Sequence, residues 1–368
     1  MTLNEAEIAF LGEPPLEIDV QNDHQRLENN LQDRYKIGKW SLVALILNRT
    51  IGSGIFLTPH QILAGTGCVG GTLLLWILGA VISLCGLYVW LECGLSMPQR
   101  KVLGEDEPRG VPRSGGEKNF LEFMFPDERN APGQRTHLRT TCCFAVMFIL
   151  MYNLSGNALS FAIRAMEASG VYDSAEEEPP DRGTTIGIAI AILSLVVVAH
   201  MFSRDIGIKI NNAFAVMKSA LLVAIICLGV AKAAGRFGGP GDVIKHNFET
   251  NPWKTQRSDL QSWSHSLLLI MYCFSGYEQP FYVLAETKSP RKLFPKYTVL
   301  AFGIATVLFL LVNVSYLLVV DKRDVLEDIV DKDLDLATLF FKGLFQGDRR
   351  KAARSMSALI AVSIFGNL

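Results

Sequence analysis

The sequence lacks the residue patterns on which soluble enzymes, metal proteins and secreted domains depend. Its seven cysteines form no CxxC pair and no disulfide framework, and its six histidines show no ligand spacing, so we expect neither a metal site nor a cofactor. A net charge of −1 and the lack of any nucleic-acid-binding motif exclude a DNA- or RNA-binding protein. No nucleophile–base pair is apparent, so we expect no enzyme. The cysteines are expected to be small buried hydrophobic residues.

A charged and then apolar opening is also missing from the N-terminus. Residues 1–38 are polar and mildly acidic, which excludes a cleaved signal peptide and predicts a disordered cytoplasmic tail. The distribution of Lys and Arg among the later connections favours the same orientation, with a cytoplasmic N-terminus in the plasma membrane.

Long apolar runs dominate the rest of the chain, with 49% apolar residues and a mean hydropathy of +0.26. Each run is close to the roughly 20 residues that a bilayer-crossing helix needs. The sequence therefore predicts an all-α polytopic membrane protein with a transmembrane domain over 39–368. An eighth run begins near Ser355 and continues to Leu368, so we expect the chain to be truncated at its C-terminus. The full spans are expected at about 40–60, 68–93, 141–163, 185–202, 213–233, 263–286 and 297–320.

Two of the spans contain small residues at their centres. Gly52 and Gly54 flank a serine in the first span, and each glycine costs roughly 1 kcal/mol against alanine in a helix interior. Ser275-Gly276 interrupts the sixth span in the same way and is followed by the ionisable Glu278. Both helices are therefore expected to open. Paired broken helices in the two halves of a membrane protein indicate the midplane site of a secondary transporter.

Two opened helices provide the backbone groups that a zwitterion needs. The helix that restarts after the first break directs unpaired N–H groups and its positive dipole end at the break, which suits an α-carboxylate. The helix that ends near Tyr272 offers carbonyl oxygens without partners, which suit an α-ammonium group.

Three charged residues lie within the predicted spans and are candidates for function, because a charge in the bilayer is costly. Lys218 either extends to the inner surface or lies beside the opened first helix, where it exchanges a proton. Glu278 either titrates during the cycle or stays a neutral acid. Arg49 either pairs with a carboxylate or reaches the inner vestibule.

Four motifs occur in the order typical of one transporter family. They are Gly52-Ser53-Gly54-Ile55-Phe56, Pro112-Arg113-Ser114-Gly115-Gly116-Glu117, Lys218 after Asn211-Asn212, and Glu286-Thr287-Lys288-Ser289-Pro290. With them, residues 38–368 resemble the amino acid–polyamine–organocation permeases, most of all the L-type amino acid permeases and their high-affinity methionine permease branch. The resemblance implies the five-plus-five inverted-repeat fold, incomplete here after the start of the eighth span.

The resemblance also implies roles for single residues. Ser53 and Gly54 match positions that bind the substrate carboxylate, and Tyr272, Cys273 and Ser275 match acceptors of its amino group. Ser155 falls near a pocket-lining position, and Lys218 matches a lysine of proton-coupled members. The expected substrate site comprises Ile51, Gly52, Ser53, Gly54, Ser155, Tyr272, Cys273, Phe274, Ser275 and Gly276, with Lys218 and Glu278 for proton coupling.

These observations together predict a proton-coupled importer of neutral L-amino acids, with methionine as the first candidate. Its expected partners are the amino acid, the proton and the lipid bilayer. A polyamine or choline permease with Glu278 as counter-ion is one alternative. A receptor that binds an amino acid without transporting it is another.

Overall fold

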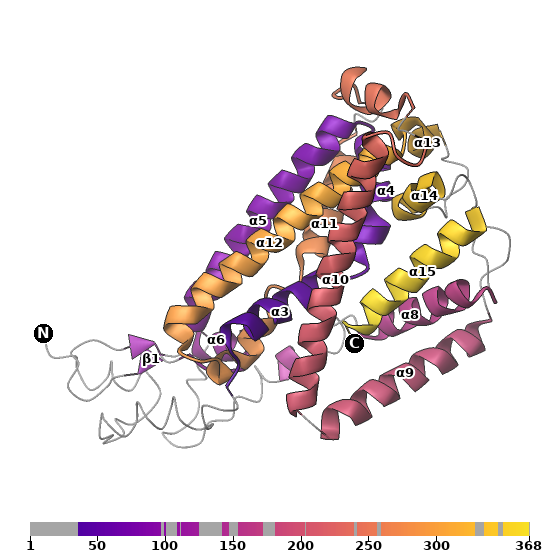
Figure 1. The fold of residues 1–368 in the computed structure, drawn as a ribbon. Helices are drawn as coiled ribbons and strands as arrows, with labels where there is room; N and C mark the ends of the chain where they lie inside the picture. The colour runs from indigo at the N-terminus through magenta and orange to yellow at the C-terminus, as the bar shows by residue number, and fades with distance from the viewer. Residues whose placement is uncertain are drawn as a thin grey trace, which may run out of the picture. The chain divides into compact units, whose positions relative to one another are not determined.

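Among the residues that the structure describes, nearly all regular structure is helical (Figure 1). The computed structural model describes residues 36–96, 99–100, 109–110, 112–124, 142–146, 154–171, 181–202, 204–238, 241–255, 259–327, 335–344 and 349–367. Residues 1–35, most of the predicted tail, lie outside the described residues. The predicted all-α class is confirmed, and the inverted repeat stays a prediction.

The elements follow the apolar runs of the sequence, and two of the predicted spans are each divided into two helices. A two-residue antiparallel strand pair joins Gln99 to Gly110 and Arg100 to Arg109. The helices and strands are α3 (Lys39–Thr50), α4 (Gly54–Thr66), α5 (Val69–Ser96), β1 (Gln99–Arg100), β2 (Arg109–Gly110), α6 (Glu117–Met124), α8 (Leu154–Ser169), α9 (Arg182–Phe202), α10 (Arg204–Ala233), the π-helical turn η2 (Lys245–Glu249), α11 (Leu260–Phe274), the 3₁₀ helix η3 (Gln279–Glu286), α12 (Pro290–Val319), α13 (Lys322–Glu327), α14 (Leu336–Leu344) and α15 (Arg349–Phe365).

Among the described residues, three helices are long and apolar enough to cross a bilayer. They are Val69–Ser96, Ile206–Ala233 and Pro290–Val319. The pair α3 and α4, bent by 46° at its break, makes a fourth candidate span. The predicted third span begins partly outside the described residues, and the count of seven full spans stays a prediction.

The chain divides into two compact units. The first unit comprises Met1–Val43, Cys85–Tyr152 and Glu278–Leu300, and the second comprises Ala44–Leu84, Asn153–Tyr277 and Ala301–Leu368. Helices α3, α5 and α12 contribute residues to both units.

In the first unit, the motif Pro112–Glu117 and the motif Glu286–Pro290 meet at η3. The loop Pro112–Glu117 binds η3 through its backbone and side chains: Gly115 N–H donates to the Tyr282 carbonyl over 3.1 Å, and the Tyr282 hydroxyl donates to Glu117 over 2.5 Å. Ile37, at the start of the described chain, pairs with Thr287 in a parallel bridge. The loop Pro112–Glu117, Ile37 and Thr287 are thus held together in one local packing arrangement around η3.

In the second unit, aromatic rings pack around the end of α11. The Phe274 ring lies 5.9 Å from Trp76, 5.5 Å from Phe302 and 5.3 Å from Phe309, measured between centroids. Phe274, Trp76 and Phe309 are fully buried. Such ring pairs add about 0.5–1.5 kcal/mol each beyond the burial of their area, so α5, α11 and α12 are firmly joined next to the second break.

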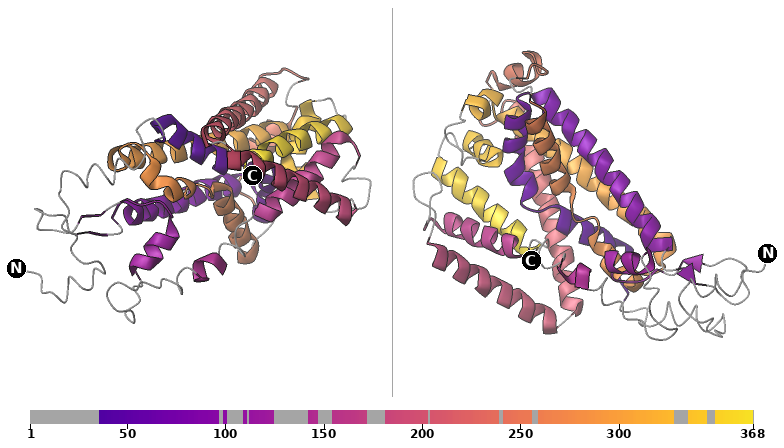
Figure 2. Two further views of the ribbon diagram at one scale, coloured as in Figure 1. Left: turned by 90° about the horizontal axis from the view of Figure 1, so that it is seen from below. Right: turned by 180° about the vertical axis from the view of Figure 1, so that it is seen from behind.

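Helices α8, α9 and α15 lie side by side in the same unit, as the views of Figures 1 and 2 agree. Small residues, Ala158, Ala162 and Ala189, form the buried contact between α8 and α9. A buried carboxylate joins α8 to α15: the Ser357 hydroxyl donates to Glu167 over 2.6 Å, and Arg164 donates to the same carboxylate over 3.0 Å. Two partners satisfy Glu167, as burial of a charge requires.

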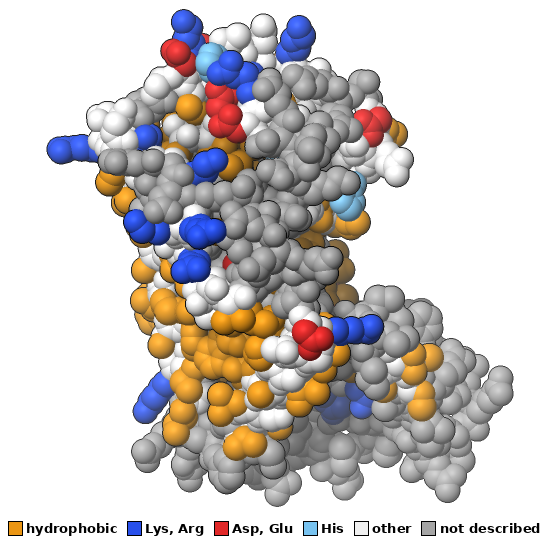
Figure 3. Space-filling model, turned by 90° about the vertical axis from the view of Figure 1, so that its right-hand side faces the viewer, with side chains coloured by type: hydrophobic (Ala, Val, Ile, Leu, Met, Phe, Trp, Pro, Cys, Tyr) orange, Lys and Arg blue, Asp and Glu red, His pale blue; other side chains and the backbone are white. Residues whose placement is uncertain are grey.

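The surface of the protein carries many apolar side chains. On the face drawn in Figure 3, hydrophobic side chains gather in one continuous area. Exposed apolar area of this extent is typical of surfaces that contact lipid or another protein. In α9 the exposed hydrophobic residues include Ile186, Ile190, Leu195, Val197 and Val198.

The expectation that all cysteines are buried is wrong. Cys68 and Cys273 are buried, but four others are exposed: Cys85, Cys142, Cys143 and Cys227. The sequence places each of them in an apolar run, and an apolar run of a membrane protein has a lipid-facing side as well as a buried one.

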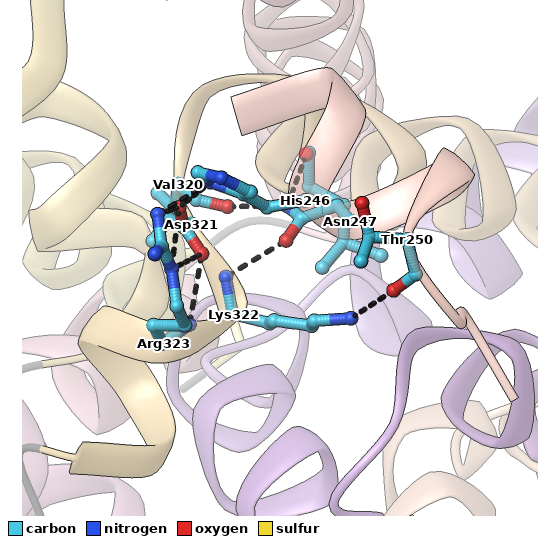
Figure 4. Close-up of polar contacts among 8 residues, drawn as sticks. His246, Asn247, Thr250, Val320, Asp321, Lys322 and Arg323 are labelled. Carbon is cyan, nitrogen blue, oxygen red and sulfur yellow. Dashed lines mark hydrogen bonds and ion pairs between the residues drawn. The ribbon is translucent and has the colours of Figure 1, made fainter. Parts of the chain in front are cut away.

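A polar segment, residues 245–255, joins two turns of the second unit, and we call it the strap. At one end Asn247 donates to the carbonyls of Leu317 and Val320, at 2.8 and 2.7 Å, and accepts the Lys322 N–H (Figure 4). The two carbonyls lie at the end of α12 and the N–H is the first of α13, and groups at helix ends have no partner within their own helix.

The other end of the strap binds the turn between α4 and α5. The Gly70 N–H donates to the Pro252 carbonyl over 2.9 Å, and the Thr255 hydroxyl donates to the Thr66 carbonyl over 2.6 Å. The strap therefore ties the end of α4 to the end of α12.

Asp321 is the charged centre of this attachment (Figure 4). Its carboxylate lies 2.8 Å from His246 Nδ1 and 2.7 Å from Arg323 Nη2. Burial raises the pKa of the Asp321 carboxyl, but hydrogen bonds from the Arg323 side chain and backbone, the contact with His246 and the charge of Arg323 outweigh it and lower the pKa to about 2.

Replacing Asp321 by asparagine is expected to lower stability by about 2 kcal/mol at pH 7, because the folded pKa lies below the unfolded value of about 3.9. The contribution of the ionised carboxylate is present above about pH 4 and is lost as the pH falls to about 2. Thermal unfolding in detergent, measured from pH 7 down to about pH 2, should show the stabilities of the wild type and the variant converging at acid pH. Asp242→Asn, an exposed carboxylate near the strap, is the control and should follow the wild type. A difference that persists at pH 2 would contradict the assignment.

Candidate functional site

The first helix break lies between α3 and α4, at Ile51–Ser53. The Ile51 N–H still donates to the Leu47 carbonyl over 2.9 Å, whereas the Gly52 N–H turns back to the Thr50 carbonyl over 2.9 Å. Helical bonding resumes when Phe56 and Leu57 both donate to the Ser53 carbonyl. The glycines thus open the helix where the sequence predicts.

The second break begins after Phe274. Ser275 is extended, and its N–H and hydroxyl both donate to the Tyr272 carbonyl, over 3.2 and 2.8 Å. Gly276 follows with a φ of 113°, a conformation that residues with a Cβ rarely adopt. The chain then continues in the 3₁₀ helix η3 and not in an α-helix.

The two breaks are in contact with each other. A Cβ on Gly54 would lie 3.0 Å from the Cys273 sulfur and 3.4 Å from its Cα. A Cβ on Gly276 would lie 2.8 Å from Cγ of Arg49 and 3.1 Å from the Thr50 nitrogen. Both glycines therefore allow one backbone to approach the other, and larger residues would push the two helices apart.

Thr58 and Cys273 add a side-chain link beside this contact. The Thr58 hydroxyl lies 3.0 Å from the Cys273 sulfur and donates to the Gly54 carbonyl over 3.0 Å. Both side chains are buried. The first turn of α4 is thus held against the last turn of α11.

Backbone groups at both breaks are available to a ligand. In the described part of the chain, no hydrogen bond is found to the N–H groups of Ser53, Gly54 and Ile55, which open α4. Nor do the carbonyls of Cys273 and Phe274, at the end of α11, accept a hydrogen bond from any described residue. A helix N-terminus favours an anion and free carbonyls favour a cation, so the pair can bind both ends of a zwitterion.

Lys218 lies beside the first break. Its ammonium donates to the Asn48 carbonyl over 2.7 Å and to Oδ1 of Asn367 over 2.5 Å. The residue is 1% exposed, so the alternative that Lys218 extends to the membrane surface is wrong. The Asn48 carbonyl lies at the opened end of α3, and the ammonium takes the place of the N–H that a continuous helix would offer it. A backbone carbonyl in the membrane interior needs such a hydrogen bond.

The end of α15 completes this polar cluster. The Asn367 carbonyl accepts a hydrogen bond from Arg49 over 2.5 Å, and the Gly366 carbonyl accepts one from the Asn48 amide over 2.7 Å. A Cβ on Gly52 would lie 2.7 Å from the Asn367 amide nitrogen. In addition, the Ser363 hydroxyl donates to the Ile51 carbonyl over 3.3 Å. Ser363 of α15 and the two residues that follow this helix therefore satisfy the break from one side.

The remaining predicted site residues differ in their positions. Tyr272 is 47% exposed and Ser275 is exposed. The Phe274 ring packs in the aromatic core, so Phe274 offers only its backbone to a ligand. Ser155 is an exposed residue of α8, and no hydrogen bond joins it to another described residue. Glu278 directly precedes η3 in the first unit, and its role in proton coupling stays a prediction.

Sequence reasoning missed Asn48, Ser363 and Asn367 as parts of the site. One signal was available, because an amide side chain within an apolar run needs a hydrogen-bonding partner. The Asn48 amide finds two, in Asn211 at 2.8 Å and in Gly366.

A family model described as amino acid permease matches residues 37–368. The chain belongs to the amino acid permease family. This confirms the resemblance that the four motifs indicate, and the family is one of transporters and not of enzymes.

Curated relatives of the permease include transporters from yeast and mammals. The high-affinity methionine permease of Saccharomyces cerevisiae is 26% identical over 92% of this chain and 52% of its own length. The low-affinity methionine permease of the same yeast is 27% identical over 90% of this chain and 54% of its own. The b(0,+)-type amino acid transporter 1 of Oryctolagus cuniculus is 24% identical over 84% of this chain and 56% of its own length. The permease spans about half the length of these relatives.

Proposed function

We propose that this permease imports neutral L-amino acids across the plasma membrane, with methionine as the first candidate. The observation that carries the proposal is the contact between the two helix breaks, Gly54 against Cys273 and Gly276 against Thr50. Among the described residues, the N–H groups that open α4 and the carbonyls that end α11 have no hydrogen-bonding partner, and they match the carboxylate and the ammonium group that all α-amino acids share.

Selection for neutral substrates and for methionine is supported by chemistry and by similarity. The first break, Ile51–Ser53, contains no carboxylate that would bind a cationic side chain. Two relatives of the permease are methionine permeases.

We further propose that a proton gradient drives uptake and that Lys218 exchanges the proton. Its ammonium bridges the α3 backbone and Asn367, so loss of a proton would remove the positive charge from both hydrogen bonds and weaken the hold of Lys218 on the opened helix. A charge change at this point would thereby alter the geometry of the substrate site.

Radiolabelled methionine uptake by the protein at its native length tests the proposal. Uptake should be saturable, should collapse with a protonophore, and should fall about 100-fold in Ser53→Trp, because an indole would cover the start of α4. Ser194→Trp on the exposed face of α9 is the matched control and should retain uptake.

Each other result points to a different function. Competition by spermidine equal to that by methionine would indicate a polyamine carrier. Methionine binding without flux would indicate a receptor. Uptake that ignores the proton gradient would refute the coupling.

A further inference from the structure

Two adjacent cysteines differ from the others in exposure and position. Cys142 and Cys143 are both exposed and form the start of a described helical stretch, residues 142–146. They lie at the beginning of the apolar run that predicts the third span. Their exposure shows that the thiols are not in a packed core, and their place in the sequence puts them at the start of the predicted span.

The charges around this span indicate which boundary it is. Basic residues are concentrated before the cysteines and are sparse beyond the other end of the span, where the connection 170–184 is strongly acidic. Because Lys and Arg collect in cytoplasmic connections near the ends of spans, we expect Cys142 and Cys143 at the cytoplasmic end. The basic residues nearest to the cysteines are Arg129, Arg135 and Arg139, whereas 170–184 contains Arg182 alone.

We propose that Cys142 and Cys143 are S-acylated by long-chain fatty acids. Cysteines next to a span on the cytoplasmic side are the sites at which reversible S-acylation occurs. The donor is a long-chain acyl-coenzyme A, used by a membrane acyltransferase. The cysteine thiolate attacks the thioester carbonyl, a new carbon–sulfur bond forms, and the bond to coenzyme A breaks, so that coenzyme A leaves as a thiol with the proton that the cysteine gave up.

The geometry of a pair gives the modification a physical consequence. One acyl chain gives marginal and reversible membrane attachment, whereas two give a stable anchor. Two chains at Cys142 and Cys143 would hold the start of the third span, and the long connection before it, at the inner bilayer surface.

The other exposed cysteines provide matched controls. Cys85 lies 11 residues before the end of α5, about 16 Å along the helix axis, and so within the hydrocarbon. Cys227 lies six residues before the end of α10, about 9 Å, at the predicted outer side. Both residues are exposed, like the pair, but are expected to be remote from the cytoplasmic surface.

Mass-tag exchange on the full chain from eukaryotic cells tests the proposal. Free thiols are blocked, thioesters are cleaved with hydroxylamine, and the released thiols are tagged with a polyethylene glycol maleimide. Two tags are expected in the wild type and in Cys85→Ser/Cys227→Ser, one in each of Cys142→Ser and Cys143→Ser, and none in the double variant. Metabolic labelling with an alkynyl palmitate should show the same series.

The controls keep the proposal open to refutation. Each single serine variant changes one sulfur to oxygen at an exposed position, so folding should be preserved, which size-exclusion chromatography in detergent checks. A wild type without hydroxylamine-dependent tags would overturn the proposal. So would tags that persist in Cys142→Ser/Cys143→Ser, or tags that disappear in the Cys85/Cys227 variant.

Discussion

Replacing Lys218 by methionine is expected to reduce amino acid uptake by about 100-fold while the protein remains folded. The ammonium group is buried and donates to two acceptors, the Asn48 carbonyl and Asn367 Oδ1. Methionine fills a similar volume but donates no hydrogen bond. Each buried acceptor left without a partner costs about 1–3 kcal/mol, and a total of about 3 kcal/mol corresponds to the expected factor.

The effect should be specific to this lysine and to proton coupling. Lys209→Met changes an exposed lysine of the same helix, α10, and should leave uptake unchanged. Asn367→Ala removes one of the two acceptors of the Lys218 ammonium and retains the contact of Lys218 with α3. We therefore expect reduced uptake whose rate depends less steeply on pH. Uptake in Lys218→Met that keeps its full rate and its dependence on the proton gradient would refute the role of Lys218.

Replacing Gly54 by valine is expected to abolish uptake, with a loss of about 100-fold or more. The position has no room for a side chain, because a Cβ would lie 3.0 Å from the Cys273 sulfur and 3.4 Å from the backbone of α11. Valine adds two methyl groups beyond that Cβ. The start of α4 would have to move away from α11, and the N–H groups at the first break would no longer face the carbonyls at the second.

A double substitution distinguishes this contact from general damage to a helix. Gly54→Ala should lower uptake less than valine does, and Gly54→Ala/Cys273→Ala should recover part of it, because removal of the sulfur takes away the closest atom. Gly187→Ala in α9 is the control, since a Cβ there has no neighbour within 4 Å, and uptake should be unaffected. If the double variant is no better than Gly54→Ala alone, the proposed contact does not control the site.

The comparison with known proteins and the geometry of the helix breaks support the proposed function in different ways. The family match covers residues 37–368 and shows the class of protein. It does not show which backbone groups a ligand would meet. That comes from the free N–H groups at the start of α4 and the free carbonyls at the end of α11, which the described structure brings to one place.

The sequence by itself determined the helical membrane class and both helix breaks, because these are local properties. Apolar runs specify spans, and Gly52, Gly54 and Ser275-Gly276 weaken a helix wherever they occur. It also identified Lys218 as a charge that needs an explanation in the membrane.

Only the tertiary structure decided what meets at the breaks. Asn48 and Gly366 are separated by 318 residues and share a hydrogen bond, and no local pattern encodes such a pair. In the same way, burial of Cys273 and exposure of Cys142 follow from which side of a helix faces a neighbour. An apolar residue is compatible with both lipid and protein core, so composition leaves the choice open until packing makes it.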